Sequence, residues 1–281
     1  MKSRSWFRRL SLVVGFAFLY VPILSMIFFS FNNSRLVTVW DAEDSPTLKW
    51  YRALLSNEQI LGAAWLSIKV ATVNATVAVV LGTLAGLVLA RFGPFKGRTL
   101  LSGMTTAPLV MPEVITGLSL LLLFVSLEQM IGWPQGRGFV TIVIAHITFS
   151  MAYVTVVVQS RLATFDDSLE EAALDLGARP ARVFFRITLP LILPAILSGW
   201  LLAFTLSWDD LVISQFVAGP GSTTLPMVVF SKVRLGVSPD INALATIMVT
   251  IVGLGVVLSA LYMRRQERRV ALEMQMARSE K

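Results

Sequence analysis

Six long apolar runs dominate the sequence and restrict the kind of fold that the chain can adopt. An α-helix needs roughly 20 apolar residues to cross the hydrocarbon core of a bilayer, which is about 30 Å thick. Only 15% of the residues are charged, whereas soluble domains carry about 25%. The sequence therefore predicts an all-α integral membrane protein with six transmembrane helices. Their expected ranges are 10–31, 61–90, 100–125, 139–160, 191–217 and 243–263.

The distribution of Lys and Arg predicts the orientation, because short cytoplasmic loops are enriched in these residues. Most of them lie in the termini and in the loops near positions 91–98 and 161–186. We therefore expect residues 1–9 and 264–281 to be cytoplasmic, 32–60 to form a periplasmic loop, and 61–263 to form a five-helix core. This asymmetry in a lipid environment accounts for the net charge of +7, so nucleic acid is not an expected partner.

Several chemistries are excluded by the residues that the sequence lacks. There is no cysteine and a single histidine, which removes disulfides, thiolate metal sites and the H-E-x-x-H zinc motif. No lysine follows a glycine, so the chain contains no nucleotide-binding P-loop. We expect a chain without catalytic residues, bound metal or cofactor.

The most informative loop, residues 161–190, is much longer than a connection between two helices requires. Ser168 and Glu171 have the spacing of a capping box, which predicts a helix start. Gly177 ends that helix, and Pro180 suits the first turn of a second one. We expect Pro190 to end the second helix before the next span. A helical hairpin of this kind suits insertion into a cleft of another protein, although a loop lying on the membrane surface remains the alternative.

The string EAALDLGARPARVFFRITLP within this loop resembles the EAA motif of permease subunits of ATP-binding-cassette (ABC) importers. The matching positions are Glu171, Ala172, Ala173, Gly177, Ile187, Leu189 and Pro190. The resemblance implies a type I ABC importer permease fold in which this loop is the coupling helix. It also implies that two copies of an ATP-binding subunit, a second permease and a periplasmic binding protein are partners. The residues expected to couple to the ATPase are Glu171, Ala172, Ala173, Gly177 and Arg182.

Two further strings, SWDDLVISQFVAGPG and LPMVVFSKVRLGVSPDINALATI, are similar to those of polyamine permeases within this family. The similarity implies a permease in the bacterial inner membrane that carries a polyamine. Putrescine is the expected substrate, and spermidine is the nearest alternative.

Ionisable residues inside predicted spans are candidates for the substrate pathway, because charges at bilayer depth are costly. The candidates are Lys69, Glu113, Asp209 and Asp210, with Trp208 as a cation–π partner for an amine. Adjacent residues on a helix diverge by about 100°, so only one of the two aspartates is expected to face the pathway. A structural ion pair between Lys69 and one aspartate is the alternative, and for Glu113 it is a buried hydrogen bond.

Three features of the core helices are expected to be structural. His146 is expected to form hydrogen bonds between helices, and Gly82 and Gly86 to permit close helix packing.

Two other functions remain open from the sequence alone. An ion-coupled secondary transporter of cationic amines or another small solute would work without ATP. An intramembrane hydrolase would use Asp209 and Asp210 as a carboxylate pair. Neither has a use for the hairpin at 161–190.

Overall fold

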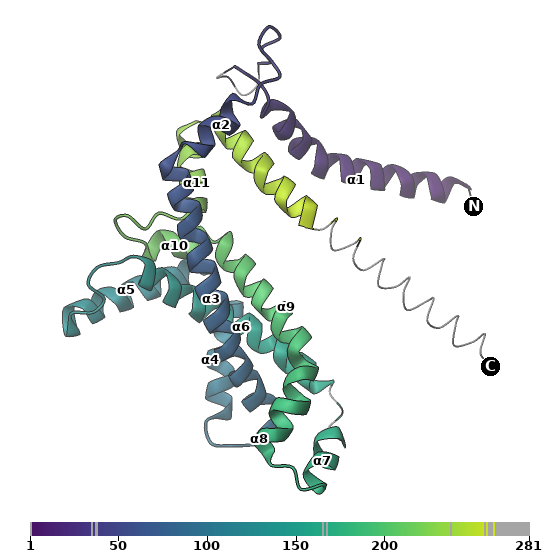
Figure 1. Cartoon of the computed structure of the whole chain (residues 1–281), viewed down its shortest axis with the longest axis vertical. Coiled ribbons are helices and arrows are strands. Elements are labelled where there is room, and N and C mark those ends of the chain that lie inside the picture. Colours follow the sequence, from purple (N-terminus) through teal and green to yellow (C-terminus); the bar gives the residue numbers. More distant parts are fainter. Residues whose placement is uncertain are drawn as a thin grey trace. The chain divides into compact units, whose positions relative to one another are not determined.

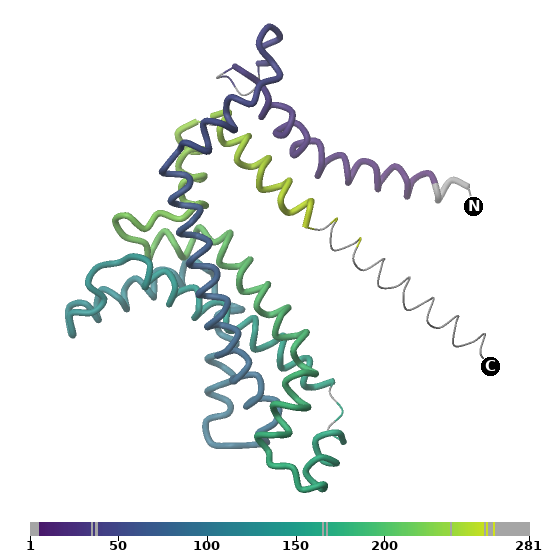
Figure 2. Tube along the Cα trace, viewed as in Figure 1, coloured from purple at the N-terminus to yellow at the C-terminus, as the bar shows by residue number. Residues whose placement is uncertain are grey.

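The computed structural model describes residues 2–34, 36, 39–164, 166, 168–236, 238–255, 257 and 261, and these contain helices and no strand. The chain divides into two compact units, one made of residues 1–58 and 231–281 and the other of residues 59–230. Figures 1 and 2 trace the helices of both units.

The first unit contains α1 (Lys2–Phe29), α2 (Lys49–Leu55) and an apolar helix, Pro239–Gly255. The apolar part of α1, Trp6–Phe29, buries none of its most hydrophobic stretch, as expected for a helix surrounded by lipid. The segment after α1 folds against its end. The Trp50 side chain donates from Nε1 to the Asn32 carbonyl at 2.7 Å, and the hydroxyls of Ser30 and Tyr51 lie 2.6 Å apart.

The second unit contains the helices that carry the candidate sites. In chain order they are α3 (Glu58–Arg91), α4 (Arg98–Val110), α5 (Glu113–Ile131), α6 (Phe139–Ala163), α7 (Ser168–Asp175), α8 (Pro180–Val183), the π-helical turn η1 (Phe184–Thr188), α9 (Leu189–Trp208) and α10 (Val212–Val217). The next helix, α11 (Leu225–Leu235), continues past the boundary between the units.

Small residues allow α3, α6 and α9 to pack closely around Val154, which is completely buried. A Cβ atom added to Gly82 would lie 2.7 Å from the Val154 Cβ, and one added to Gly199 would lie 3.2 Å from its Cγ1. Asn74 on α3 bridges the other two helices, because its Nδ2 donates to the Ser150 Oγ at 3.1 Å and to the Ala203 carbonyl at 2.9 Å. The predicted packing role of Gly82 is therefore confirmed.

Two predicted spans are interrupted in the structure. The helix expected over 100–125 is divided, since α4 ends at Val110 and α5 begins at Glu113. Met111 is extended, with ψ of 136°, because a residue that precedes proline avoids the helical region. The helix expected over 191–217 is likewise broken between Trp208 and Val212.

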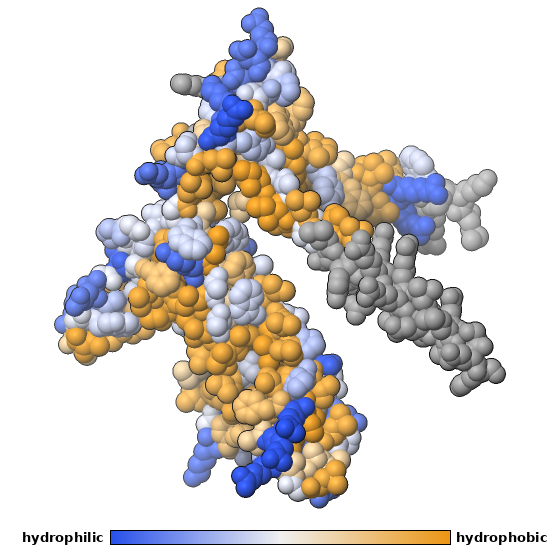
Figure 3. Space-filling view, in the orientation of Figure 1, coloured by the Kyte–Doolittle hydropathy of each residue, from blue (hydrophilic) through white to orange (hydrophobic). Residues whose placement is uncertain are grey.

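Within the described residues, five helices are long and apolar enough to cross a membrane, and Pro239–Gly255 is a shorter sixth. The five are Trp6–Phe29, Glu58–Arg91, Glu113–Ile131, Phe139–Ala163 and Pro180–Trp208. The end of the last predicted span and the tail at 264–281 lie outside the described residues. In the view of Figure 3, hydrophobic residues cover much of the visible face of the second unit, and a group of hydrophilic residues lies near the end that carries α7 and α8.

Candidate functional site

The hairpin formed by α7 and α8 begins where the sequence predicted. Ser168 is the first residue of α7, and its amide donates to Asp166 Oδ1 at 3.0 Å. Hydrogen bonds from the backbone and side chain of Ser168 hold the pKa of the Asp166 carboxyl below its usual value. Pro180 occupies the first turn of α8, where its missing amide hydrogen leaves no hydrogen bond unmade.

Gly177 ends α7 in the left-handed conformation, with φ of 81°. The Gly177 amide donates to the Leu174 carbonyl at 2.9 Å, and the Ala178 amide to the Ala173 carbonyl at 3.0 Å. These two bonds form a Schellman motif, which satisfies carbonyls that the helix end would otherwise leave free. The turn of the hairpin therefore depends on a backbone conformation that favours glycine.

The expectation that Pro190 separates the hairpin from the next span is wrong. Pro180–Trp208 is a continuous helical segment, in which η1 joins α8 to α9. The Leu189 amide donates to the Phe184 carbonyl, five residues earlier, and this wider π turn accommodates Pro190, which has no amide hydrogen. As a result, the second arm of the hairpin is an extension of the membrane-length helix.

The coupling residues predicted on α7 and α8 present a largely open face. Glu171, Ala172 and Arg182 are exposed, and Ala173 is half-buried. Four large hydrophobic side chains are also exposed, with exposed fractions of 90% for Leu176, 64% for Phe185, 51% for Leu169 and 44% for Leu174. This combination of exposed hydrophobic and charged side chains is typical of a surface that binds a protein.

Sequence reasoning missed the acid that connects α7 to two other elements. Glu170, next to the predicted Glu171, accepts hydrogen bonds at Oε1 from the Arg91 Nη2 at 3.5 Å and the Thr188 Oγ1 at 2.5 Å. Arg91 is in the last turn of α3 and Thr188 in η1. The signal in the sequence was the doubled acid at the start of α7, but the spacing could not tell which of the two faces inward.

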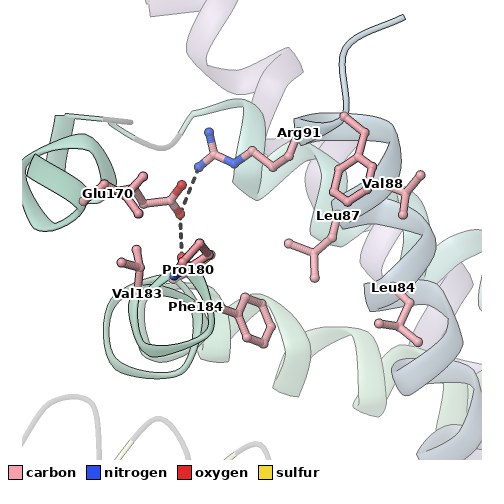
Figure 4. Close-up of a pocket in the computed structure, with 11 residues that line it drawn as sticks. Leu84, Leu87, Val88, Arg91, Glu170, Pro180, Val183 and Phe184 are labelled. Carbon is pink, nitrogen blue, oxygen red and sulfur yellow. Dashed lines mark hydrogen bonds and ion pairs between the residues drawn. The ribbon is translucent and has the colours of Figure 1, made fainter. Parts of the chain in front are cut away.

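A cavity of about 330 Å³ lies beside this contact, against the last turns of α3. Its walls are mostly hydrophobic and come from α3, α7, α8 and η1, as Figure 4 shows. The lining residues include Leu87, Leu174, Val183 and Phe184, and the Arg91–Glu170 ion pair contributes the charged part. The packing between α7 and α3 is therefore incomplete on the apolar side.

The break after α9 brings Asp210 to His146 rather than to Lys69. The Asp210 Oδ2 lies 3.1 Å from the His146 Nε2 and accepts from the Ser214 amide at 2.7 Å. The other nitrogen of His146 lies 2.6 Å from the Ser207 Oγ. Asp210 thus binds the first turn of α10, and the predicted hydrogen-bonding role of His146 is confirmed.

Asp209 differs from its neighbour, because its side chain is exposed. It follows three half-buried aromatic residues spaced four apart on α9, Trp200, Phe204 and Trp208. Successive ring centroids are 5.4 and 6.1 Å apart, and the interplanar angles are 17° and 10°. We call these three rings the aromatic ladder. The predicted divergence of Asp209 and Asp210 is therefore observed.

The other two pathway candidates are both exposed, and one of them lies at a different place in its helix from the one expected. Glu113 is exposed in the first turn of α5, not near the middle of a helix, because the chain breaks at Pro112. Lys69 is exposed on α3, and its Nζ lies 5.9 Å from the centre of the Trp65 ring. Among the described residues it forms no ion pair with Asp209 or Asp210, so the alternative of a structural ion pair is not observed.

Comparison with known proteins identifies the family. Residues 78–272 match the family described as the inner membrane component of binding-protein-dependent transport systems. The chain belongs to this family. It is 55% identical over 275 residues to the putrescine transport system permease protein PotI of Escherichia coli (strain K12), covering 98% of this chain and 97% of PotI. It is 41% identical to the spermidine/putrescine transport system permease protein PotC of the same strain, covering 89% and 90%.

Solved structures share the fold at low sequence identity. A bacterial ABC transporter that imports the acidic polysaccharide alginate has a TM-score of 0.70 at 15% identity, covering 92% of this chain and 95% of that one. The methionine ABC transporter MetNI, in an inward-facing conformation, has a TM-score of 0.58 at 14% identity, covering 71% and 92%. The predicted fold class, an all-α permease of ABC importer type, is confirmed.

Family membership also decides between the functions that the sequence left open. The relatives are permease subunits of ABC importers, not enzymes, so the chain is a transport subunit rather than a hydrolase. The reading as an ion-coupled secondary transporter is excluded on the same ground. The family is described as an inner membrane component, and the alginate ABC transporter has also been solved in complex with a periplasmic protein that binds an alginate pentasaccharide.

Proposed function

We propose that this chain is one half of the membrane pathway of an importer that carries putrescine. The observation that supports it best is the 55% identity to PotI over nearly the full length of both chains, against 41% to PotC. We further propose that the complete importer contains a second permease, two ATP-binding subunits and a periplasmic polyamine-binding protein.

The hairpin of α7 and α8 is the proposed contact with the ATPase. Its exposed face offers hydrophobic anchors, among them Leu176, beside the charges of Glu171 and Arg182. In protein interfaces, buried hydrophobic anchors supply most of the binding energy, and charges set orientation. Because α8 continues into α9, displacement of the hairpin by the ATPase is passed to a membrane-length helix.

This arrangement requires the hairpin to face the cytoplasm, where ATP is available. The Lys and Arg residues flanking it support that orientation, and both termini are proposed to lie on the same side. The loop at 32–60 is then periplasmic, on the side from which a binding protein delivers substrate.

The proposed route for the amine follows the end of α9. Asp209 provides an exposed negative charge, and the adjacent aromatic ladder provides ring faces that attract ammonium groups. A linear diamine carries a charge at each end, so it can contact the carboxylate and a ring at once. Glu113 and Lys69, both exposed, remain proposed pathway residues: Glu113 as a further acid and Lys69 as a cation that limits entry.

The test replaces PotI by this chain in the E. coli putrescine transport system and measures uptake of radiolabelled putrescine. We expect ATP-dependent uptake, with spermidine a weaker competitor than putrescine. Copurification of the ATPase with the chain verifies that the importer has assembled. An assembled importer that takes up no putrescine, or that prefers spermidine, would refute the proposed substrate.

A further inference from the structure

The contact of Glu170 with two other elements suggests how α7 is fixed within this chain. None of the residues of α7 is buried, so core packing does not hold the helix in place. The cavity of about 330 Å³ beside it leaves its apolar side loosely packed against α3. The polar contact of Glu170 therefore provides the link between α7 and the end of α3.

Glu170 has the geometry for this task. A single oxygen, Oε1, receives both the guanidinium of Arg91 and the hydroxyl of Thr188. Thr188 is 4% exposed, and the side chains of Glu170 and Arg91 are each 21% exposed. Hydrogen bonds to a charged group that is largely shielded from water are stronger than those of exposed ion pairs. Figure 4 shows the contact at the edge of the cavity.

The two partners of Glu170 belong to long helical segments. Arg91 is the last residue of α3, which begins at Glu58. Thr188 is the last residue of η1 and belongs to the continuous helical segment Pro180–Trp208. A cation in the last turn of a helix is favoured by the helix dipole, so α3 supplies Arg91 at a suitable position. Glu170 therefore ties α7 to both segments at once.

We propose that Glu170 is a positioning residue that makes α7 move as one body with α3 and α9. This inference rests on the proposed docking of the ATPase to the hairpin. It assigns the link from the first arm of the hairpin, α7, to the spans to the Arg91–Glu170–Thr188 contact, which we call the Glu170 clamp, while α8 is joined to α9 by the continuous helix. The exposed Glu171 then serves the partner, while Glu170 serves the fold of this subunit. Without the clamp, the ATPase remains docked on the hairpin, but α7 moves independently of α3 and α9.

The chain has no native cysteine, so a covalent bridge can replace the clamp. The test uses the complete importer in proteoliposomes and measures ATP hydrolysis and putrescine uptake on the same sample. In the Arg91→Cys/Glu170→Cys variant we expect the uptake per ATP to fall by about tenfold, the factor that follows from losing hydrogen bonds to a charged group. Bridging the two thiols with a short bismaleimide restores the ratio.

The single variants Arg91→Cys and Glu170→Cys, treated with the same reagent, are the controls and stay uncoupled. Copurification of the ATPase verifies that each variant still assembles. Normal coupling in the unbridged double variant, or a bridge that blocks uptake, would overturn the clamp. If instead the ATPase no longer copurifies with Glu171→Lys while Glu170 variants couple normally, the docking proposal survives and the clamp alone fails.

Discussion

Replacing Gly177 with valine tests how far coupling depends on the turn of the hairpin. Gly177 has φ of 81°, and a Cβ atom added there would meet nothing within 4 Å. The cost is therefore conformational rather than steric, at about 1–2 kcal/mol for a residue with a side chain in this region. Because 1.4 kcal/mol corresponds to about tenfold in an equilibrium constant, this cost lowers the ratio of the intact turn to opened forms by about 5-fold to 30-fold.

We expect Gly177→Val to reduce putrescine uptake by up to about that factor in the assembled importer, while substrate capture by the binding protein is unchanged. Gly177→Asn should retain most of the activity, because asparagine tolerates the left-handed conformation. The assay is radiolabelled uptake together with ATP hydrolysis in proteoliposomes.

Gly136 offers a matched control, since it has the same φ of 81° and the same free space around a Cβ atom. It lies in the connection between α5 and α6, away from the hairpin in sequence. Gly136→Val places a side chain at the same positive φ and should leave uptake per ATP unchanged. Wild-type coupling in Gly177→Val, or an equal loss in Gly136→Val, would refute the reasoning.

Three further changes follow from contacts in the second unit. Gly82→Val places its side chain against Val154 and should destabilise the subunit by about 1–3 kcal/mol, measured by thermal denaturation in detergent. Gly103→Val is the control, because a Cβ atom there meets nothing within 4 Å, and it should destabilise the subunit less. Equal losses of stability in the two variants would contradict the packing argument. Asp210→Asn should lower the melting temperature because it weakens the contacts with His146 and Ser214. Asp209→Asn should lower uptake without a change in melting temperature. The reverse result would show that Asp210 is the pathway residue and Asp209 the structural one. Phe204→Leu should raise the KM for putrescine more than Phe185→Leu, and no difference would remove the aromatic ladder from the pathway.

Local signals in the sequence were sufficient to predict the hairpin. The start of α7 at Ser168, the turn after it at Gly177 and the start of α8 at Pro180 each depend on neighbouring residues only. The apolar runs similarly gave the membrane-length helices, because hydropathy over about 20 residues needs no tertiary information.

The sequence was less informative where tertiary contacts or helix breaks decide the outcome. Hydropathy continues across Pro112 and Leu211, so two interrupted helices were predicted as continuous. The proline was a visible signal for the first break, whereas the second depends on Asp210 contacting His146, far away in the sequence. The choice between Glu170 and Glu171 as the inward-facing acid likewise depends on Arg91.

The docking of the hairpin on an ATPase is the central claim, and a single cysteine at Leu176 tests it most directly. This side chain is 90% exposed at the turn, and Leu176→Cys would be the only thiol in the chain. We expect it to crosslink to the ATP-binding subunit in the assembled importer, and to resist a membrane-impermeant maleimide added outside intact cells. A residue that forms no crosslink in the assembled importer, or that is labelled from outside, would contradict the account.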